Sequence, residues 1–268
     1  MKKYLSKFES IIANPWQTGF IWLLVIFLLV SFFLSLSIDL RYDHYTYLSQ
    51  AMLRGHLYLD TLPEQAFDTI YVQGRYYPNF LPMPAVILLP FQFLFSQFES
   101  TFWQGYLYFP LTIAIYFLAA KIAAKRGYNN IDSKYWGFAF CFASIYFLSA
   151  FSPSTWSLPQ ALSVALMLMA IVEYDNQRRY WLIGALVGAI LLSRPTAALG
   201  IIFFVLIFWR GSPKLSFKNW LALLAPFCLA IVLWGGYNQA RFGSPTEDGY
   251  RLVNNKDFIM EGPAYRQD

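Results

Sequence analysis

Charged residues are scarce in this sequence: they make up 13% of its 268 residues, whereas 57% are hydrophobic and 20% are aromatic. An ordinary soluble domain carries about a quarter charged residues and far less apolar surface. The composition therefore excludes a soluble globular protein and predicts an integral membrane protein.

Cysteine and histidine are also rare. The two cysteines, Cys141 and Cys228, lie within apolar runs and have no His or Cys partner at the spacing of a metal site, so we interpret them as packing residues. His44 and His56 have no matching carboxylate pair, which favours solvated loop residues. No metal-ligand set or cofactor motif is evident, and whether a divalent metal assists stays open.

A contiguous basic stripe is missing as well. The net charge is +5, but the basic residues form short clusters between apolar runs, which argues against nucleic acid as a partner. The first apolar stretch follows a basic start and has no small-x-small cleavage pattern, so it predicts an uncleaved signal anchor.

The long apolar stretches predict an all-α, polytopic transmembrane bundle that forms one domain over residues 1–268. Short cytoplasmic loops collect Lys and Arg. All basic clusters share one side if 81–98 does not cross the bilayer and 181–209 crosses twice as a hairpin; one long tilted helix over 181–209 is the alternative. The prediction is a cytoplasmic N-terminus and seven spans, at about 20–38, 102–120, 135–151, 158–174, 181–193, 196–209 and 219–237.

The first predicted extracytoplasmic loop, residues 39–101, is longer than most connections between helices. It contains many of the polar and aromatic side chains that we expect to be exposed. Within it, 44–54 has helical spacing, with Tyr45, Leu48 and Met52 on one face and Gly55 as a stop. We expect a short helix on the outer membrane surface, with its tyrosines in the headgroup layer.

Asp43 stands immediately before that predicted helix. It could cap the helix by accepting backbone N–H bonds from the first turn. It could also be a general base, because a carboxylate close to the apolar walls of a helix bundle can have a raised pKa. The two interpretations are compatible.

Arg75 lies on a turn marked by Gly74, between two short extended pieces. It could contact lipid headgroups or bind a phosphate at the membrane surface. The prolines at 78, 82 and 84 then predict an irregular path into 81–98, which we expect to lie along the bilayer or dip into it.

Three stretches together resemble the GT-C class of polytopic glycosyltransferases, in particular family 39 protein mannosyltransferases and aminoarabinose transferase-like enzymes. They are "DLRYDHYTYLSQAMLRGHLYLD" (39–60), "YVQGRYYPNFLPMPAVILLP" (71–90) and "GALVGAILLSRPTAALG" (184–200). The tail "NQARFGSPTEDGYR" (238–251) is similar to a stretch that follows a later span in bacterial members.

This resemblance implies a polyprenyl-phosphate sugar as donor, an extracytoplasmic acceptor, a bacterial plasma membrane location, and Asp43 as the base towards the acceptor hydroxyl. Arg75, Arg194 and Arg241 share the outer side in the predicted topology and are the candidates for the donor phosphate. Arg194 interrupts an apolar stretch, which is costly, although it could also be an ordinary cap at the hairpin turn.

The sequence departs from the family pattern in two ways. Many members carry a second acidic residue in the outer loop that here reads "SPSTWSLPQ" (152–160), which leaves Asp60, Glu64 and Asp68 of the first loop as candidate second acids. Members are also longer, so the sequence could be part of a longer protein.

Other classes of function stay open. A transporter or flippase of lipid-linked sugars would show pseudo-repeats and ionisable residues at mid-membrane, and neither is evident here. A surface polysaccharide polymerase is a further alternative. A membrane anchor would not need a long, charged and aromatic first loop.

Overall fold

The computed structural model describes residues 42–62, 68–151, 154–211 and 215–249, with single residues at 19, 22, 25, 26, 29 and 252. The first predicted span, 20–38, therefore lies almost entirely outside the described residues. In the described ranges the chain is mostly helical, and its single sheet is a two-stranded antiparallel hairpin. The helical fold class is confirmed at this level.

The hairpin consists of β1 (Thr69–Val72) and β2 (Arg75–Pro78). Gly74 has φ +80° in its turn, a conformation that glycine adopts without strain, and the predicted turn is confirmed. The helices are α3 (His44–Leu53), α4 (Met83–Ser96), η1 (Gln104–Leu107), α5 (Tyr108–Lys125), α6 (Asn130–Phe142), α7 (Ile145–Phe151), α8 (Leu158–Asp175), α9 (Tyr180–Leu191), η2 (Pro195–Leu199), α10 (Gly200–Arg210) and α11 (Phe217–Phe242).

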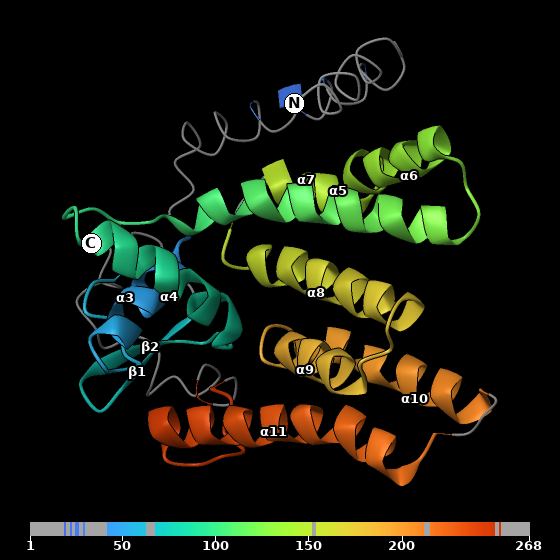
Figure 1. The fold of residues 1–268 in the computed structure, drawn as a ribbon. Coiled ribbons are helices and arrows are strands. Elements are labelled where there is room, and N and C mark those ends of the chain that lie inside the picture. The colour runs from blue at the N-terminus through green and yellow to red at the C-terminus, as the bar shows by residue number, and fades with distance from the viewer. Residues whose placement is uncertain are drawn as a thin grey trace.

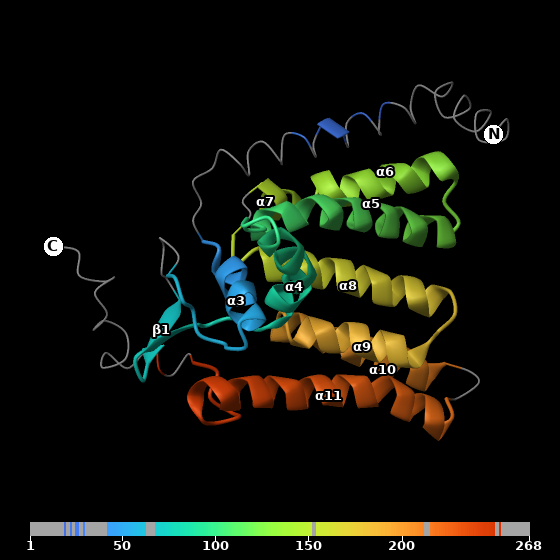
Figure 2. The ribbon, with the colours of Figure 1, turned by 60° about the vertical axis from the view of Figure 1, so that its left-hand side comes forward.

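The long helices form a layered bundle. Helix α5 packs on α8, α8 on α9, and α9 on α11, while α6 packs along α5 (Figure 1). Helices α3 and α4 and the hairpin gather at one end of this bundle, as Figure 2 also shows. We call this the loop end. At the opposite end, the basic end, lie Lys125, Arg126, Arg178, Arg179, Arg210 and Lys218.

Three helical segments are long and apolar enough to cross a membrane: Gln104–Lys125, Leu158–Asp175 and Phe217–Phe242. Shorter apolar helices cover Met83–Ser96, Tyr180–Leu191 and Pro195–Arg210. These segments indicate a membrane protein, and the count of seven spans stays a prediction. The α5 span continues about five residues beyond the predicted end, because lysine stems at a helix end can pack on apolar surface while their ammonium groups reach water.

The predicted irregular path after Pro78 covers residues 79–82, and the segment into which it leads forms helix α4 (Met83–Ser96). Pro82 occupies the N-cap and Pro84 the first turn, positions where a missing N–H breaks no helical hydrogen bond. Helix α4 packs against α3, and Leu88 between them is fully buried.

The predicted span 135–151 is not one helix, because α6 ends at Phe142 and α7 begins at Ile145. Ser144 lies at this break. Its Oγ donates to the carbonyl of Phe140 (2.5 Å) and accepts from the N–H of Tyr146 (3.2 Å). A serine hydroxyl that bonds the backbone in this way competes with the helical hydrogen bonds.

The 181–209 stretch forms a hairpin, and the alternative of one long helix is wrong. Helix α9 ends at Leu191, and η2 with α10 returns from Pro195 to Arg210. The backbone at Arg194 is extended (φ −150°, ψ 99°), so the helix is interrupted there. The described basic clusters consequently lie together at the basic end, as the hairpin prediction requires.

Helix α3 runs from His44 to Leu53, and Gly55 follows with φ +86°, which confirms the predicted helix and its stop. Its place at the outer membrane surface stays a prediction, but six of its ten residues are buried within the protein. Tyr45 and Leu48 are fully buried, and so is Ser49, which lies one turn after Tyr45 on the same face; the polar residues His44 and Thr46 are buried as well. The burial arises because α4 covers one face of α3 and the 101–107 segment contacts its first turn.

Two glycines of α9 permit close packing on α11. A Cβ at Gly184 would collide with the backbone carbonyl of Leu223, and one at Gly188 would lie 3.0 Å from the Cβ of Ala230. Small residues at such positions let membrane helices approach closely.

We expect Gly184→Ala to destabilise the fold by about 1–3 kcal/mol, because α9 must move away from α11. Gly236→Ala is the matched control, since a Cβ there meets nothing within 4 Å and alanine favours a helix. Thermal unfolding in detergent measures both variants. Equal melting temperatures would contradict the close packing of α9 on α11.

Candidate functional site

The start of α3 is held by two residues that are distant in the sequence. The N–H of His44 donates to Oγ1 of Thr155 (3.2 Å), and the N–H of Tyr45 donates to Oε1 of Gln104 (3.0 Å). The second of these donors is one that a capping side chain would normally satisfy. Asp43 makes no such bond, although it occupies the N-cap position. The capping interpretation of Asp43 is therefore wrong.

The same two residues also fix the chain just before α3. Thr155 donates to the carbonyl of Tyr42 through its N–H (3.0 Å) and its hydroxyl (2.5 Å), and Nε2 of Gln104 donates to that carbonyl (2.9 Å). The N–H of Gln104 in turn donates to Oγ1 of Thr46 (2.9 Å). Residues 42–46 are thus held between the start of η1 and the segment before α8.

Thr155→Val tests this network. We expect it to destabilise the protein by about 1–3 kcal/mol, because the isosteric side chain can neither accept from the buried N–H of His44 nor donate to the carbonyl of Tyr42. The control is Thr246→Val, since Thr246 is exposed and its hydroxyl bonds only Ser244 among the residues that the structure describes. Thermal unfolding measures the difference, and a Thr155 variant as stable as the control would contradict the network.

The carboxyl group of Asp43 is half-buried, and one of its two oxygens makes no hydrogen bond with the described residues. Its Oδ1 is buried and has no hydrogen-bond partner among the described residues. Burial raises the pKa of Asp43 from 3.8 to about 6, against the opposing effect of its own backbone N–H. A carboxylate with this pKa can accept a proton near neutral pH, as a general base must.

A pocket of about 360 Å³ opens at the loop end beside this segment. Asp43 is not in its lining, but Tyr45 is, and so is Thr155, which bonds both chain neighbours of Asp43. We call it the loop-end pocket. Its lining comes from the first loop, the 155–159 segment, the turn before η2, and α11 with the residues after it: Tyr45, Asn79, Phe80, Leu81, Thr155, Trp156, Pro159, Ser193, Arg194, Pro195, Thr196, Trp234, Asn238, Arg241 and Asp248.

Two arginines give this pocket its cationic wall. Arg241 is only 5% exposed. Its Nη1 donates to the carbonyl of Pro78 (2.8 Å) and its Nη2 to Oδ1 of Asn238 (2.9 Å), while its guanidinium lies 3.9 Å from the ring centre of Tyr237. Arg194 is exposed, and its side chain makes no hydrogen bond or ion pair with the described residues. Arg194 can therefore bind a ligand without losing an internal contact.

Several buried polar atoms of the pocket residues are unpaired within the described part of the chain. They are Nε of Arg241, Nε1 of Trp234, and both Nδ2 and Oδ1 of Asn79. Buried polar groups in folded proteins nearly always have partners, so each such atom needs an explanation. Three of the four are donors, which fits a ligand rich in acceptor oxygens.

Arg75 lies away from this wall. It is exposed on the hairpin, and its guanidinium is 4.5 Å from the ring centre of Tyr58. It is not in the lining of the loop-end pocket. The structure thus separates Arg75 from Arg194 and Arg241, with which the sequence grouped it.

The candidate second acids have different surroundings. Asp60 forms an ion pair with Arg54 (2.7 Å), and its Oδ1 lies 3.3 Å from Nε2 of His56, outside the pocket lining. Asp68 accepts from Nε1 of Trp156 (2.7 Å), and Trp156 lines the pocket. Glu64 lies outside the described residues. Asp68 is consequently the member of this set linked to the pocket.

Sequence reasoning missed part of the site. Thr155 and Gln104 belong to no recognisable sequence motif, so they were not predicted as site residues. Asp248 lies in the stretch 238–251 but was not predicted as a site acid, although it lines the pocket. The expectation of a solvated His44 is wrong: it is fully buried, and its Nδ1 lies 3.2 Å from Oγ1 of Thr155. His56 is half-buried against the ring of Tyr58 (4.0 Å between ring centres).

Comparison with protein-family models, curated proteins and solved structures finds no match to this chain. Among the residues that the structure describes, no group of three or more His, Cys, Asp or Glu side chains is placed to hold a metal ion.

Proposed function

We propose that the protein is a glycosyltransferase that moves a sugar from a polyprenyl-phosphate donor to an acceptor hydroxyl outside the cytoplasm. One observation carries this proposal. The carboxyl of Asp43, with a raised pKa and an Oδ1 that has no hydrogen-bond partner among the described residues, stands beside a pocket with two arginines, at one end of a bundle of membrane-type helices. A proton acceptor next to a phosphate-binding wall is what this transfer needs.

In the proposed reaction, Asp43 takes the proton of the acceptor hydroxyl. The acceptor oxygen forms a bond to the anomeric carbon of the sugar, and the bond from that carbon to the donor phosphate oxygen breaks. The polyprenyl phosphate leaves with the bonding electrons. Arg194 and the buried Arg241 stabilise the charge that develops on this phosphate.

The pocket also has an apolar side for the isoprenoid chain. Phe80 and Leu81 line it immediately before α4, and Trp234 lines it from α11. In this proposal the 81–98 segment runs beside the lipid of the donor.

The proposed orientation places the loop end outside the cytoplasm and the basic end inside it. This follows from the preference of Lys and Arg for short cytoplasmic loops. In a bacterial cell it corresponds to the plasma membrane, with a lipid-linked donor reached from the outer leaflet.

The test is an assay of the full chain in proteoliposomes with a set of polyprenyl-phosphate sugars and an acceptor mixture. We expect one donor to be consumed, with release of polyprenyl phosphate in an amount equal to the sugar transferred. Empty liposomes are the control. If a properly inserted protein consumes none of the donors, the proposal fails for those donors.

A flippase for lipid-linked sugars is the second candidate, because Arg194 and Arg241 would bind the same phosphate during transport. The same assay separates the two candidates. A flippase moves the donor between leaflets and leaves its sugar attached, whereas the transferase cleaves it.

A further inference from the structure

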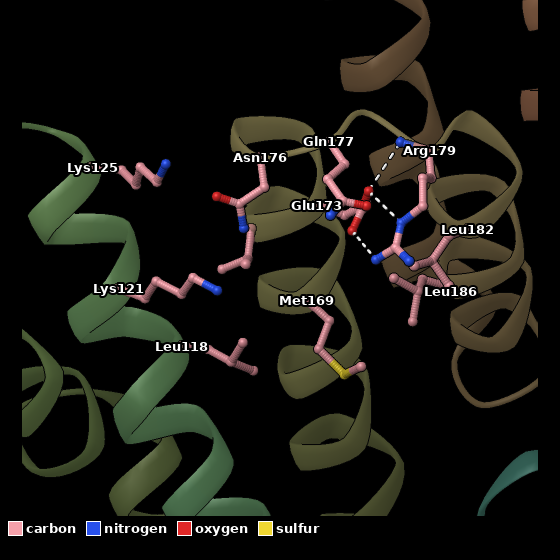
Figure 3. Close-up of a pocket in the computed structure, with 11 residues that line it drawn as sticks. Leu118, Lys121, Lys125, Met169, Glu173, Asn176, Gln177, Arg179, Leu182 and Leu186 are labelled. Atoms are coloured by element: carbon pink, nitrogen blue, oxygen red, sulfur yellow. Dashed lines mark hydrogen bonds and ion pairs between the residues drawn. The ribbon is translucent and has the colours of Figure 1, made fainter.

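A second charged groove lies at the basic end, away from the loop-end pocket. It has a volume of about 620 Å³ and runs along the C-terminal part of α8, between α5 and α9 (Figure 3). We call it the basic groove. Its lining is Leu118, Lys121, Lys125, Met169, Val172, Glu173, Asn176, Gln177, Arg179, Leu182 and Leu186.

The acidic groups near this groove are already neutralised. Glu173 accepts from Nε (2.9 Å), Nη2 (2.7 Å) and the backbone N–H (3.0 Å) of Arg179, as the dashed lines in Figure 3 show. Asp175, at the end of α8, is paired with Arg126 (3.0 Å). These two bridges leave no free carboxylate among the described lining residues.

Two lysines supply further positive charge, and Lys121 is close enough to Glu173 for their charges to attract. Lys121 and Lys125 are exposed, are four residues apart on α5, and make no hydrogen bond or ion pair with the described residues. Figure 3 shows both side chains extending from α5 towards Asn176 at the end of α8. Two ammonium groups and an amide therefore face the same space.

Below these polar groups the groove is apolar. Leu118 lies one turn before Lys121 on α5, Met169 lies one turn before Glu173 on α8, and Leu182 and Leu186 form the α9 side. Met169 is 43% exposed, so part of the surface of α8 is left uncovered by its neighbours. A soluble anion would use only the polar end of such a groove.

We propose that the basic groove binds an anionic glycerophospholipid, with its phosphate between Lys121 and Lys125 and an acyl chain along Leu118, Met169 and Leu186. Basic residues at the membrane surface attract anionic headgroups, and the apolar floor belongs to helices of membrane-spanning character. This site is separate from the proposed glycosyl transfer and does not depend on it.

The experiment uses the purified full chain and native mass spectrometry, with equal amounts of phosphatidylglycerol and phosphatidylcholine. We expect the wild type to retain phosphatidylglycerol preferentially. Lys121→Gln/Lys125→Gln should reduce that preference on the order of tenfold, because each basic residue contributes to headgroup attraction. Both lysines are exposed, so the variant should fold.

The matched control is Arg210→Gln/Lys218→Gln, which removes the same charge from the same end but outside the groove. It should keep the preference. Equal loss in both double variants would overturn the proposal in favour of general surface charge.

A third variant and a competitor test the acyl-chain part of the groove. Leu118→Asn should weaken retention of phosphatidylglycerol, and excess inorganic phosphate should displace little of it. Displacement by phosphate, or full retention in Leu118→Asn, would instead indicate a site for a soluble anion. No preference in the wild type would also overturn the proposal.

Discussion

Asp43→Asn is expected to lower transfer from a polyprenyl-phosphate sugar by about 10²–10⁴-fold, the usual contribution of a general base. Asparagine has nearly the same size as aspartate but cannot take the proton of the acceptor hydroxyl. The initial rate of polyprenyl phosphate release in proteoliposomes measures the loss. A folded, inserted Asp43→Asn protein with the wild-type rate would remove Asp43 from the reaction.

The stability of the same variant separates a catalytic role from a structural one. Because burial raises the pKa of Asp43 from 3.8 to about 6, its effect on stability is most favourable below pH 3.8 and is lost as the pH rises through about 6. A neutral amide avoids this loss. We therefore expect Asp43→Asn to unfold at the wild-type temperature or higher at pH 7.5. A markedly lower unfolding temperature would indicate a structural carboxylate.

Arg194→Gln is expected to lower kcat by about 10²–10³-fold, as removal of one donor to a developing negative charge does in other enzymes. The side chain is exposed and has no internal partner among the described residues, so the melting temperature should not change. Steady-state kinetics with the donor identified in the transfer assay measures the effect.

Arg75→Gln is the control for this variant, because it removes the same charge at the loop end but outside the pocket lining. It should keep kcat within a few-fold of the wild type. Equal losses in the two variants would mean that the arginines act through general surface charge, and an unaffected Arg194→Gln would remove Arg194 from the site.

The elements that the sequence predicted well depend on local patterns. Helix α8 was predicted at 158–174 and runs from Leu158 to Asp175, because an uninterrupted apolar stretch of that length needs no distant contact to be recognised. The stop of α3 at Gly55 and the hairpin turn at Gly74 were likewise visible, because both residues have a positive φ that glycine favours.

The parts that were not predicted depend on contacts far apart in the chain. Thr155 bonds the N–H of His44 across 111 residues, and no spacing rule reports such a pair. This bond and the bond from the N–H of Tyr45 to Oε1 of Gln104 satisfy donors in the first turn of α3. From the sequence alone, Asp43 was the expected cap of that turn. The burial of α3 was missed for the same reason, since it depends on where α4 folds back.

The candidate arginines also show the difference between local patterns and contacts that are distant in the sequence. The sequence grouped Arg75, Arg194 and Arg241 as candidates for the donor phosphate, and of these Arg194 and Arg241 line the pocket. Helix α11 continues to Phe242, and this extension places Arg241 inside the molecule against the carbonyl of Pro78. Only the packing of α11 beside the hairpin distinguishes Arg241 from Arg75.

The pH dependence of kcat/KM for the donor and acceptor pair tests the role of Asp43 most directly. This parameter reports the pKa of the essential base in the free enzyme. We expect kcat/KM to be level from about pH 7 to 8 and to fall about tenfold per pH unit well below pH 6, as the carboxylate becomes protonated. The residual activity of Asp43→Asn should lack this fall. A wild-type profile that stays level from pH 5 to 7 would contradict Asp43 as the base.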